Sequence, residues 1–74
     1  MFEFVAGDLV RFKIRDPNYR FLNLDCTSTY IDTQELSTIL YLSFLTERES
    51  TCLLMLKNGV WLQGFVFTRY LEAC

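Results

Sequence analysis

The chain has 74 residues, of which 51% are hydrophobic and 16% aromatic, and its seven Lys and Arg against nine Asp and Glu give a formal net charge of −2. This length leaves room for one domain only, residues 1–74, and the apolar share argues against a disordered chain. The acidic balance argues against a general binder of nucleic acid or of anionic membranes.

The sequence contains no histidine, which is the commonest general base and metal ligand in proteins. It also lacks a phosphate-binding loop and a closely spaced carboxylate pair on a segment that would build a cleft. We therefore expect a chain without catalytic activity, cofactor or metal.

No apolar run approaches the roughly 18 residues of a membrane-spanning helix, and the N-terminus lacks the basic and apolar pattern of a signal peptide. The three cysteines are widely spaced, which is typical of a reducing compartment. We therefore expect a cytoplasmic protein without a membrane partner, with Cys52 as a small core residue and Cys74 exposed.

Residues 9–15 alternate between apolar and polar side chains, which predicts a half-buried strand whose core face carries Val10, Phe12 and Ile14. The segment Asp16-Pro17-Asn18 ends this strand in a turn, because proline has no N–H for a ladder and its fixed φ suits a turn. A short second strand is expected over residues 19–26.

Residues 27–37 are polar and rich in hydroxyl groups, and we expect a loop there with one helical turn capped by Asp32. Residues 38–46 form the most hydrophobic stretch of the chain. Apolar side chains on both faces of an extended segment are typical of a central strand, or of a strand with one face covered by a partner. A buried helix over residues 39–45 is the competing interpretation.

The stretch from Cys52 to Glu72 carries the strongest hairpin signal. Asn58-Gly59 separates two apolar runs, and this pair favours a two-residue type I′ turn that places Lys57 opposite Val60. An isolated glycine such as Gly64 in a strand is typical of a bulge or of a bend toward another sheet. The whole pattern, about five or six short strands with turns between them, predicts a small barrel or sandwich.

Two segments resemble Src-homology-3-like barrels. Gly64-Phe65-Val66-Phe67-Thr68-Arg69-Tyr70-Leu71-Glu72 is similar to the last part of that fold, where a strand runs into one 3₁₀ turn and a short closing strand. Glu3-Phe4-Val5-Ala6-Gly7-Asp8-Leu9-Val10 is similar to the segment that leads into the second long strand. The resemblance implies an all-β fold, a small five- to six-stranded Src-homology-3-like barrel with one 3₁₀ turn near the C-terminus.

The sequence departs from the proline-binding members of that family. Phe67 stands in place of the proline and Arg69 in place of the asparagine, and the Ala-Leu-Tyr-Asp-Tyr opening and the paired tryptophans are missing. Those residues form the groove for polyproline ligands, so only Tyr70 carries over. The resemblance therefore implies barrel architecture without proline-peptide binding.

Four basic side chains lie close together in the sequence, at Arg11, Lys13, Arg15 and Arg20. Small barrels bind nucleic acid across such a face, with arginine at phosphates and an aromatic ring for stacking, for which Tyr19 and Trp61 are available. The alternative is a solvated outer face whose long side chains cover apolar neighbours. Trp61 likewise either packs on the core or anchors a partner.

These observations predict a non-catalytic interaction module that docks on a protein, because aromatic and arginine side chains dominate interface energetics. The expected anchors are Trp61, Arg69 and Tyr70, together with the basic residues of segment 11–20. Phe65 and Phe67 alternate with Val66, so one side of this triple is expected to stay outside the core, and an exposed Phe would favour self-association or a protein partner. The order of segments also resembles small barrel proteins encoded by tailed bacteriophages, which implies a host protein or a virion as partner. The rival hypothesis is a nucleic-acid-associated barrel that acts as a transcription or translation accessory factor.

Overall fold

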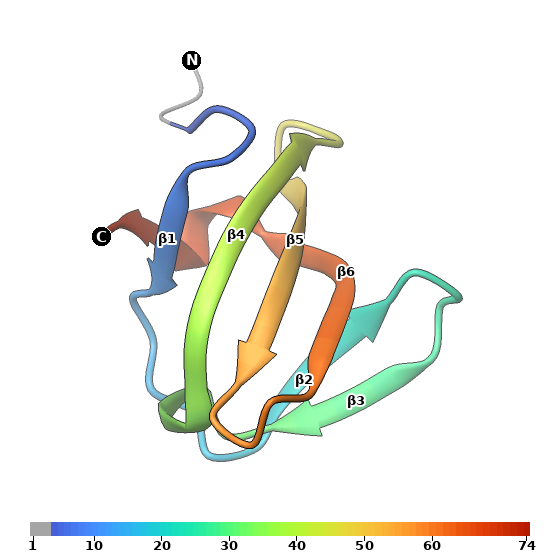
Figure 1. Ribbon diagram of the computed structural model, residues 1–74. Helices are drawn as coiled ribbons and strands as arrows, with labels where there is room; N and C mark the ends of the chain where they lie inside the picture. The colour runs from blue at the N-terminus through green and yellow to red at the C-terminus, as the bar shows by residue number, and fades with distance from the viewer. Residues whose placement is uncertain (1–3) are drawn as a thin grey trace.

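The computed structural model describes residues 4–74, and that part of the chain consists of β-strands joined by turns, with two short 3₁₀ turns (Figure 1). The seven strands are β1 Leu9–Phe12, β2 Tyr19–Asn23, β3 Ser28–Ile31, β4 Leu36–Phe44, β5 Glu49–Leu56, β6 Trp61–Phe67 and β7 Leu71–Ala73. The 3₁₀ turns are η1 Thr33–Glu35 and η2 Thr68–Tyr70. The predicted all-β class and the predicted 3₁₀ turn near the C-terminus are confirmed.

All seven strands belong to one antiparallel sheet in the order β3-β2-β6-β5-β4-β1-β7. The long strands β4, β5 and β6 lie side by side and curve around the core, while the β2–β3 hairpin continues the sheet beyond β6 (Figure 1). The sheet is open, with β3 and β7 at its edges, and the prediction of a five- to six-stranded barrel is therefore wrong.

The strand that the sequence did not reveal is β3, which lies inside the segment 27–37 that was expected to be a loop. Its four residues pair with β2 from Tyr19↔Ile31 to Leu22↔Ser28. Ile31 is the one buried side chain of β3, so the apolar alternation that marks a strand is missing from this edge. The capping prediction is confirmed, since Asp32 Oδ1 accepts a hydrogen bond from the Gln34 N–H at 2.9 Å.

The first two strands are shorter than predicted, since β1 was expected over residues 9–15 and β2 over residues 19–26. β1 ends at Phe12 because its partner β7 has three residues, and the next backbone contact, from the Lys13 N–H to the Tyr70 carbonyl at 2.7 Å, already reaches η2. β2 ends at Asn23, and the chain then turns through Cys26, whose φ of 70° lies in the left-handed region.

The β5–β6 hairpin exists, but its turn differs from the predicted one. The Leu56 N–H donates to the Val60 carbonyl at 2.9 Å, so the loop has the three residues 57–59 and Lys57 does not lie opposite Val60. Within this loop only Gly59 has a positive φ, 89°. Its N–H donates to the Leu56 carbonyl at 2.9 Å, which is the arrangement of a three-residue hairpin loop with glycine in the left-handed position.

Gly64 marks a close approach of two strands and not a bulge. The β5–β6 register runs without a shift through Cys52↔Gly64, and on its other side Gly64 pairs with Asn23 of β2. A Cβ added to Gly64 would lie 2.0 Å from the Leu22 carbonyl oxygen. β2 can pair with β6 because Gly64 has no side chain. This pairing joins the β2–β3 hairpin to the rest of the sheet.

The inner face of the sheet holds one hydrophobic core. Ile39 and Tyr41 of β4 point into it. The predicted strand and its central position are confirmed, and the helix considered for residues 39–45 is excluded. Cys52 is fully buried, as predicted. The complete set of buried apolar residues is Phe4, Val10, Tyr19, Phe21, Ile31, Ile39, Tyr41, Cys52, Leu54, Val66 and Leu71.

Candidate binding site

A groove of about 400 Å³ lies between β2 and the η2 turn. Its floor and walls are mostly aromatic and aliphatic, and one acidic and one basic side chain lie among them. The lining residues are Ile14, Asp16, Tyr19, Arg20, Leu22, Phe67 and Tyr70.

The aromatic wall is a continuous set of ring contacts that begins in the core and ends at the surface. Tyr19 packs against Phe12 with ring centroids 5.0 Å apart and meets Tyr70 edge to face at 6.4 Å. Tyr70 in turn meets Phe67 edge to face at 5.7 Å. Edge-to-face pairs hold rings in a fixed mutual orientation, so these contacts make the wall preformed.

Arg69 covers the outer end of this wall. Its guanidinium carbon lies 5.1 Å from the ring centroid of Phe67 and 5.1 Å from that of Tyr70, within the range of a cation–π contact. Its Nη2 also donates a hydrogen bond to the Tyr70 hydroxyl at 3.4 Å. Arg69 is exposed, so the structure presents an oriented guanidinium and two aromatic rings together at the rim.

The opposite side of the groove carries charges of both signs. Arg20 Nε donates to Ser28 Oγ at 2.8 Å, which ties its guanidinium to the neighbouring strand β3. Asp16 Oδ1 accepts from the Asn18 N–H at 2.9 Å, and the Asp16 N–H donates to Thr33 Oγ1 at 3.0 Å. These contacts fix the turn before β2 and thereby the position of Tyr19.

Tyr19 is the most buried aromatic residue of the groove, with 8% of its surface exposed. Burial, with smaller contributions from Tyr70, Cys52 and Asp16, raises the pKa of Tyr19 from 10.0 to about 12. The phenol is therefore neutral at physiological pH, so its hydroxyl can donate as well as accept a hydrogen bond.

The structure brings together four of the predicted site residues. Tyr19, Arg20 and Tyr70 line the groove directly, and Arg69 reaches it through its contacts with Phe67 and Tyr70.

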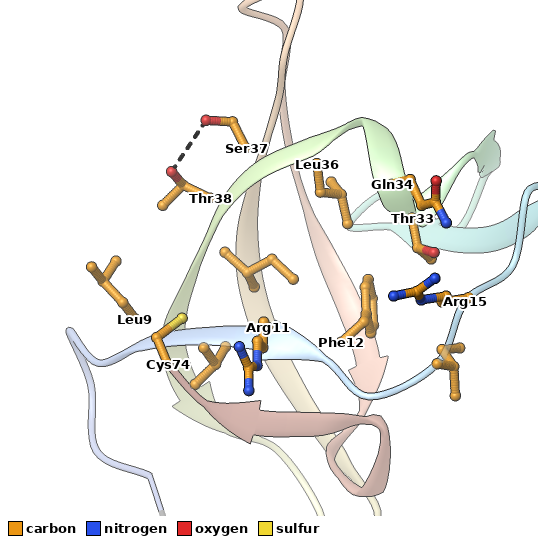
Figure 2. A pocket seen from close by; sticks show the side chains of 13 residues that line it. Leu9, Arg11, Phe12, Arg15, Thr33, Gln34, Leu36, Ser37, Thr38 and Cys74 are labelled. Atoms are coloured by element: carbon orange, nitrogen blue, oxygen red, sulfur yellow. Dashed lines mark hydrogen bonds between the residues drawn. The ribbon is translucent and has the colours of Figure 1, made fainter.

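The other four predicted residues lie elsewhere. Arg11 and Arg15 line a separate cleft between β1 and β4 (Figure 2), and Lys13 is exposed between them in the sequence. Trp61 begins β6, opposite Met55, with 53% of its surface exposed, so it lies outside both the core and the groove. The basic residues of segment 11–20 therefore do not form one continuous face.

Phe67 was not predicted as a wall of the site, although one side of the triple Phe65-Val66-Phe67 was expected to be exposed. Phe67 is 42% exposed and carries the ring on which Arg69 lies. The available signal was its position directly before the predicted 3₁₀ turn. Ile14, Asp16 and Leu22 were missed because only the tertiary packing of β2 against η2 brings them to Tyr70.

Among residues 4–74, no group of three or more Cys, Asp or Glu side chains is placed to hold a metal ion. In the same part of the chain, no helix has the length and apolar character needed to cross a membrane.

Comparison with known proteins identified no relative of this chain. No protein-family model matches this chain, and searches of curated protein sequences and of solved structures gave no match either.

Proposed function

We propose that this chain is a non-catalytic protein-interaction module that holds a segment of a partner protein in the groove formed by Tyr19, Phe67 and Tyr70. The observation that carries the proposal is the position of Arg69, whose guanidinium lies over the exposed ring of Phe67 and the half-buried ring of Tyr70 at the rim. Aromatic and arginine side chains supply most of the binding energy in protein interfaces, and here the edge-to-face contacts already order them.

The geometry favours an extended partner segment with an apolar side chain for the groove floor and an acidic side chain for the rim. Ile14 and Leu22 offer apolar contact, while Arg69 and Arg20 offer guanidinium groups on two sides. Arginine binds carboxylates through charge-assisted hydrogen bonds, which are stronger than neutral ones. Asp16 also lines the part of the groove near Arg20, and its negative charge would repel an acidic side chain there. We therefore place the partner's carboxylate next to Arg69.

An arrangement related to Src-homology-3-like barrels forms part of this proposal. Its support is the order of the C-terminal elements, in which β6 runs through Gly64 into the 3₁₀ turn η2 and then into the short strand β7. Phe67 occupies the position of the family's proline, so the groove is proposed for partners other than polyproline segments. A role as a bacteriophage-encoded modulator of a host protein, or as a small virion component, is the corresponding proposal for the partner.

The nucleic-acid hypothesis has less support from the positions of the basic residues. Arg11 Nε forms an ion pair with Glu72 Oε2 at 2.6 Å, and Arg20 is hydrogen-bonded to Ser28. Phosphate binding would also have to overcome the net negative charge of the chain. Salt dependence separates the two hypotheses, because phosphate contacts weaken steeply as salt rises and a largely apolar groove does not.

The proposal can be tested with peptides selected against the intact chain from a random library. We expect the selected peptides to carry an acidic residue near an apolar one, and the double variant Phe67→Ala/Arg69→Ala to weaken their binding at least tenfold. Trp61→Ala is the matched control, since Trp61 is also an exposed aromatic residue of β6 but lies outside the groove, and the affinities of this variant for the peptides should be unchanged. Peptides that bind both variants as tightly as the original chain would show that the groove is not the binding site.

A further inference from the structure

A second concave site lies between β1 and β4, on the side of β1 that faces away from β7. The two strands pair only at Leu9↔Leu40 and Val10↔Ile39. Beyond this point β1 continues to pair with β7 alone, and the β4–β5 register is irregular between Leu36 and Thr38. The strands diverge here and leave a cleft of about 410 Å³ (Figure 2).

The cleft has an apolar interior and a polar end. Val10, Phe12 and Ile39 lie along its inner side, and Leu36 adds to them from the start of β4. Figure 2 shows the Arg15 guanidinium next to Thr33 and Gln34 on one side of Phe12, with Arg11 on the other side. Cys74 lies at the rim away from Arg15, near Leu9.

The charges of this cleft are opposite to those of the chain as a whole. Two arginines and no Asp or Glu occur among the residues that line it, whereas the chain has a net charge of −2. Arg11 is already held by Glu72 at 2.6 Å. Arg15 forms no ion pair within residues 4–74, so its guanidinium is the group available to an anion.

Two further donors lie beside Arg15. Thr33 Oγ1 accepts the Asp16 N–H at 3.0 Å, which leaves the hydroxyl proton of Thr33 for a ligand. Gln34 follows it on η1 and lines the same end of the cleft with its side-chain amide. Of the acidic neighbours, Asp16 Oδ1 accepts from the Asn18 N–H and Asp32 Oδ1 from the Gln34 N–H, while Glu35 on η1 does not line the cleft.

We propose that this cleft binds a small carboxylate with an apolar tail. The carboxylate accepts hydrogen bonds from the Arg15 guanidinium and the Thr33 hydroxyl, and the tail lies over Phe12 and Leu36 toward the rim at Cys74. A volume of about 410 Å³ is at the lower end of the range for ligand pockets, which suits a small amphipathic molecule. The site does not depend on the partner groove and is independent of the proposed function.

The test is an NMR titration of the ¹⁵N-labelled chain with sodium octanoate, with 1-octanol as the neutral ligand of equal length. We expect saturable shifts of the amides of Phe12 and of residues 33–36, and at least tenfold weaker binding of octanol. Arg15→Gln should weaken octanoate binding at least tenfold, because the carboxylate loses its charge-assisted hydrogen bonds to the guanidinium. Arg15→Lys keeps the charge but not the bidentate geometry, so its affinity for octanoate should lie between those of the original chain and Arg15→Gln.

Arg48→Gln serves as the control, since Arg48 is exposed and lies outside the cleft, and it should bind octanoate as the original chain does. Equal affinities for octanoate and octanol, or unchanged octanoate binding in the Arg15→Gln variant, would overturn the proposal. Absence of saturable shifts at millimolar octanoate would also overturn it.

Discussion

The rings of Tyr19 and Tyr70 meet edge to face with their centroids 6.4 Å apart, and this contact joins β2 to the η2 turn near the C-terminus. The two rings come from distant parts of the sequence and belong to the same groove wall. The stability of the fold and the shape of the groove therefore depend on the same contact.

Burial of Tyr19 makes the stability of the chain sensitive to alkaline pH. The pKa of Tyr19 is raised from 10.0 to about 12 in the folded state, so the unfolded chain loses this proton first. The stabilisation is complete below pH 10 and is lost as pH rises from about 10 to about 12, by roughly 2–3 kcal/mol. Urea unfolding at a series of pH values should show that the free energy of unfolding of the original chain falls over this range. The decrease should be smaller for Tyr19→Phe.

Cys52 contributes a loss of the same sign in both proteins, because burial raises its pKa from 9.0 to about 12. The difference between the original chain and Tyr19→Phe therefore isolates the phenol. Identical alkaline losses in the two proteins would contradict the assignment to Tyr19.

The three thiols should differ in reactivity. Cys26 and Cys74 are exposed, whereas Cys52 is fully buried and its raised pKa keeps it as the unreactive thiol. We expect a thiol reagent at pH 8 to modify two cysteines quickly and the third only at the rate at which the chain unfolds. Addition of urea should accelerate the third reaction alone, and three fast thiols in the folded chain would contradict the burial of Cys52.

Gly64→Ala should destabilise the fold more than any other glycine-to-alanine change in residues 4–74. The new Cβ would meet the Leu22 carbonyl oxygen at 2.0 Å and the Phe21 ring at 2.8 Å, so β2 must move away from β6. We expect a loss of about 3 kcal/mol in the free energy of unfolding, measured by urea denaturation. Gly59→Ala is the control, because Gly59 has open space around it and only its φ of +89° resists alanine, at a cost of about 1–2 kcal/mol.

Neighbouring leucines of β5 test the two faces of the sheet. Leu54 is fully buried, and Leu54→Ala should lower the free energy of unfolding by about 2–5 kcal/mol. Leu53 lies on the opposite face and is only partly buried, so Leu53→Ala should cost about 1 kcal/mol. Thermal unfolding of both variants provides the comparison, and equal losses would contradict the strand orientation.

The parts of the fold that were predictable are those with a local pattern. Apolar side chains on both faces of residues 38–46 identify a central strand. The resemblance of the segment that begins at Gly64 to Src-homology-3-like barrels implies a strand, a 3₁₀ turn and a closing strand. β3 escaped because an edge strand with one buried residue, Ile31, has no alternation to detect. Asn58-Gly59 predicts a hairpin but not its loop length, because the register of β5 against β6 decides between two and three loop residues.

The candidate site was predictable only in part, because side chains from separate elements form it. Tyr70 followed from the family resemblance, Arg69 from the weight of arginine in interfaces, and Tyr19 from its place as a stacking ring among the basic residues. That Phe67 and not Trp61 completes the wall depends on how β6 packs, since both are exposed aromatic residues of the same strand. The one local difference between them is that Phe67 directly precedes the 3₁₀ turn, whereas Trp61 follows the hairpin loop.

The central claim is that a partner protein is held at Phe67, Arg69 and Tyr70, and quantitative affinity capture from the native cells tests it most directly. Three baits are compared: the original chain, Phe67→Ala/Arg69→Ala, and Trp61→Ala. The account predicts at least one protein that the original chain and Trp61→Ala retain equally and that the double variant loses. It would be contradicted if the double variant captured the same proteins as the original chain, or if only Trp61→Ala lost them.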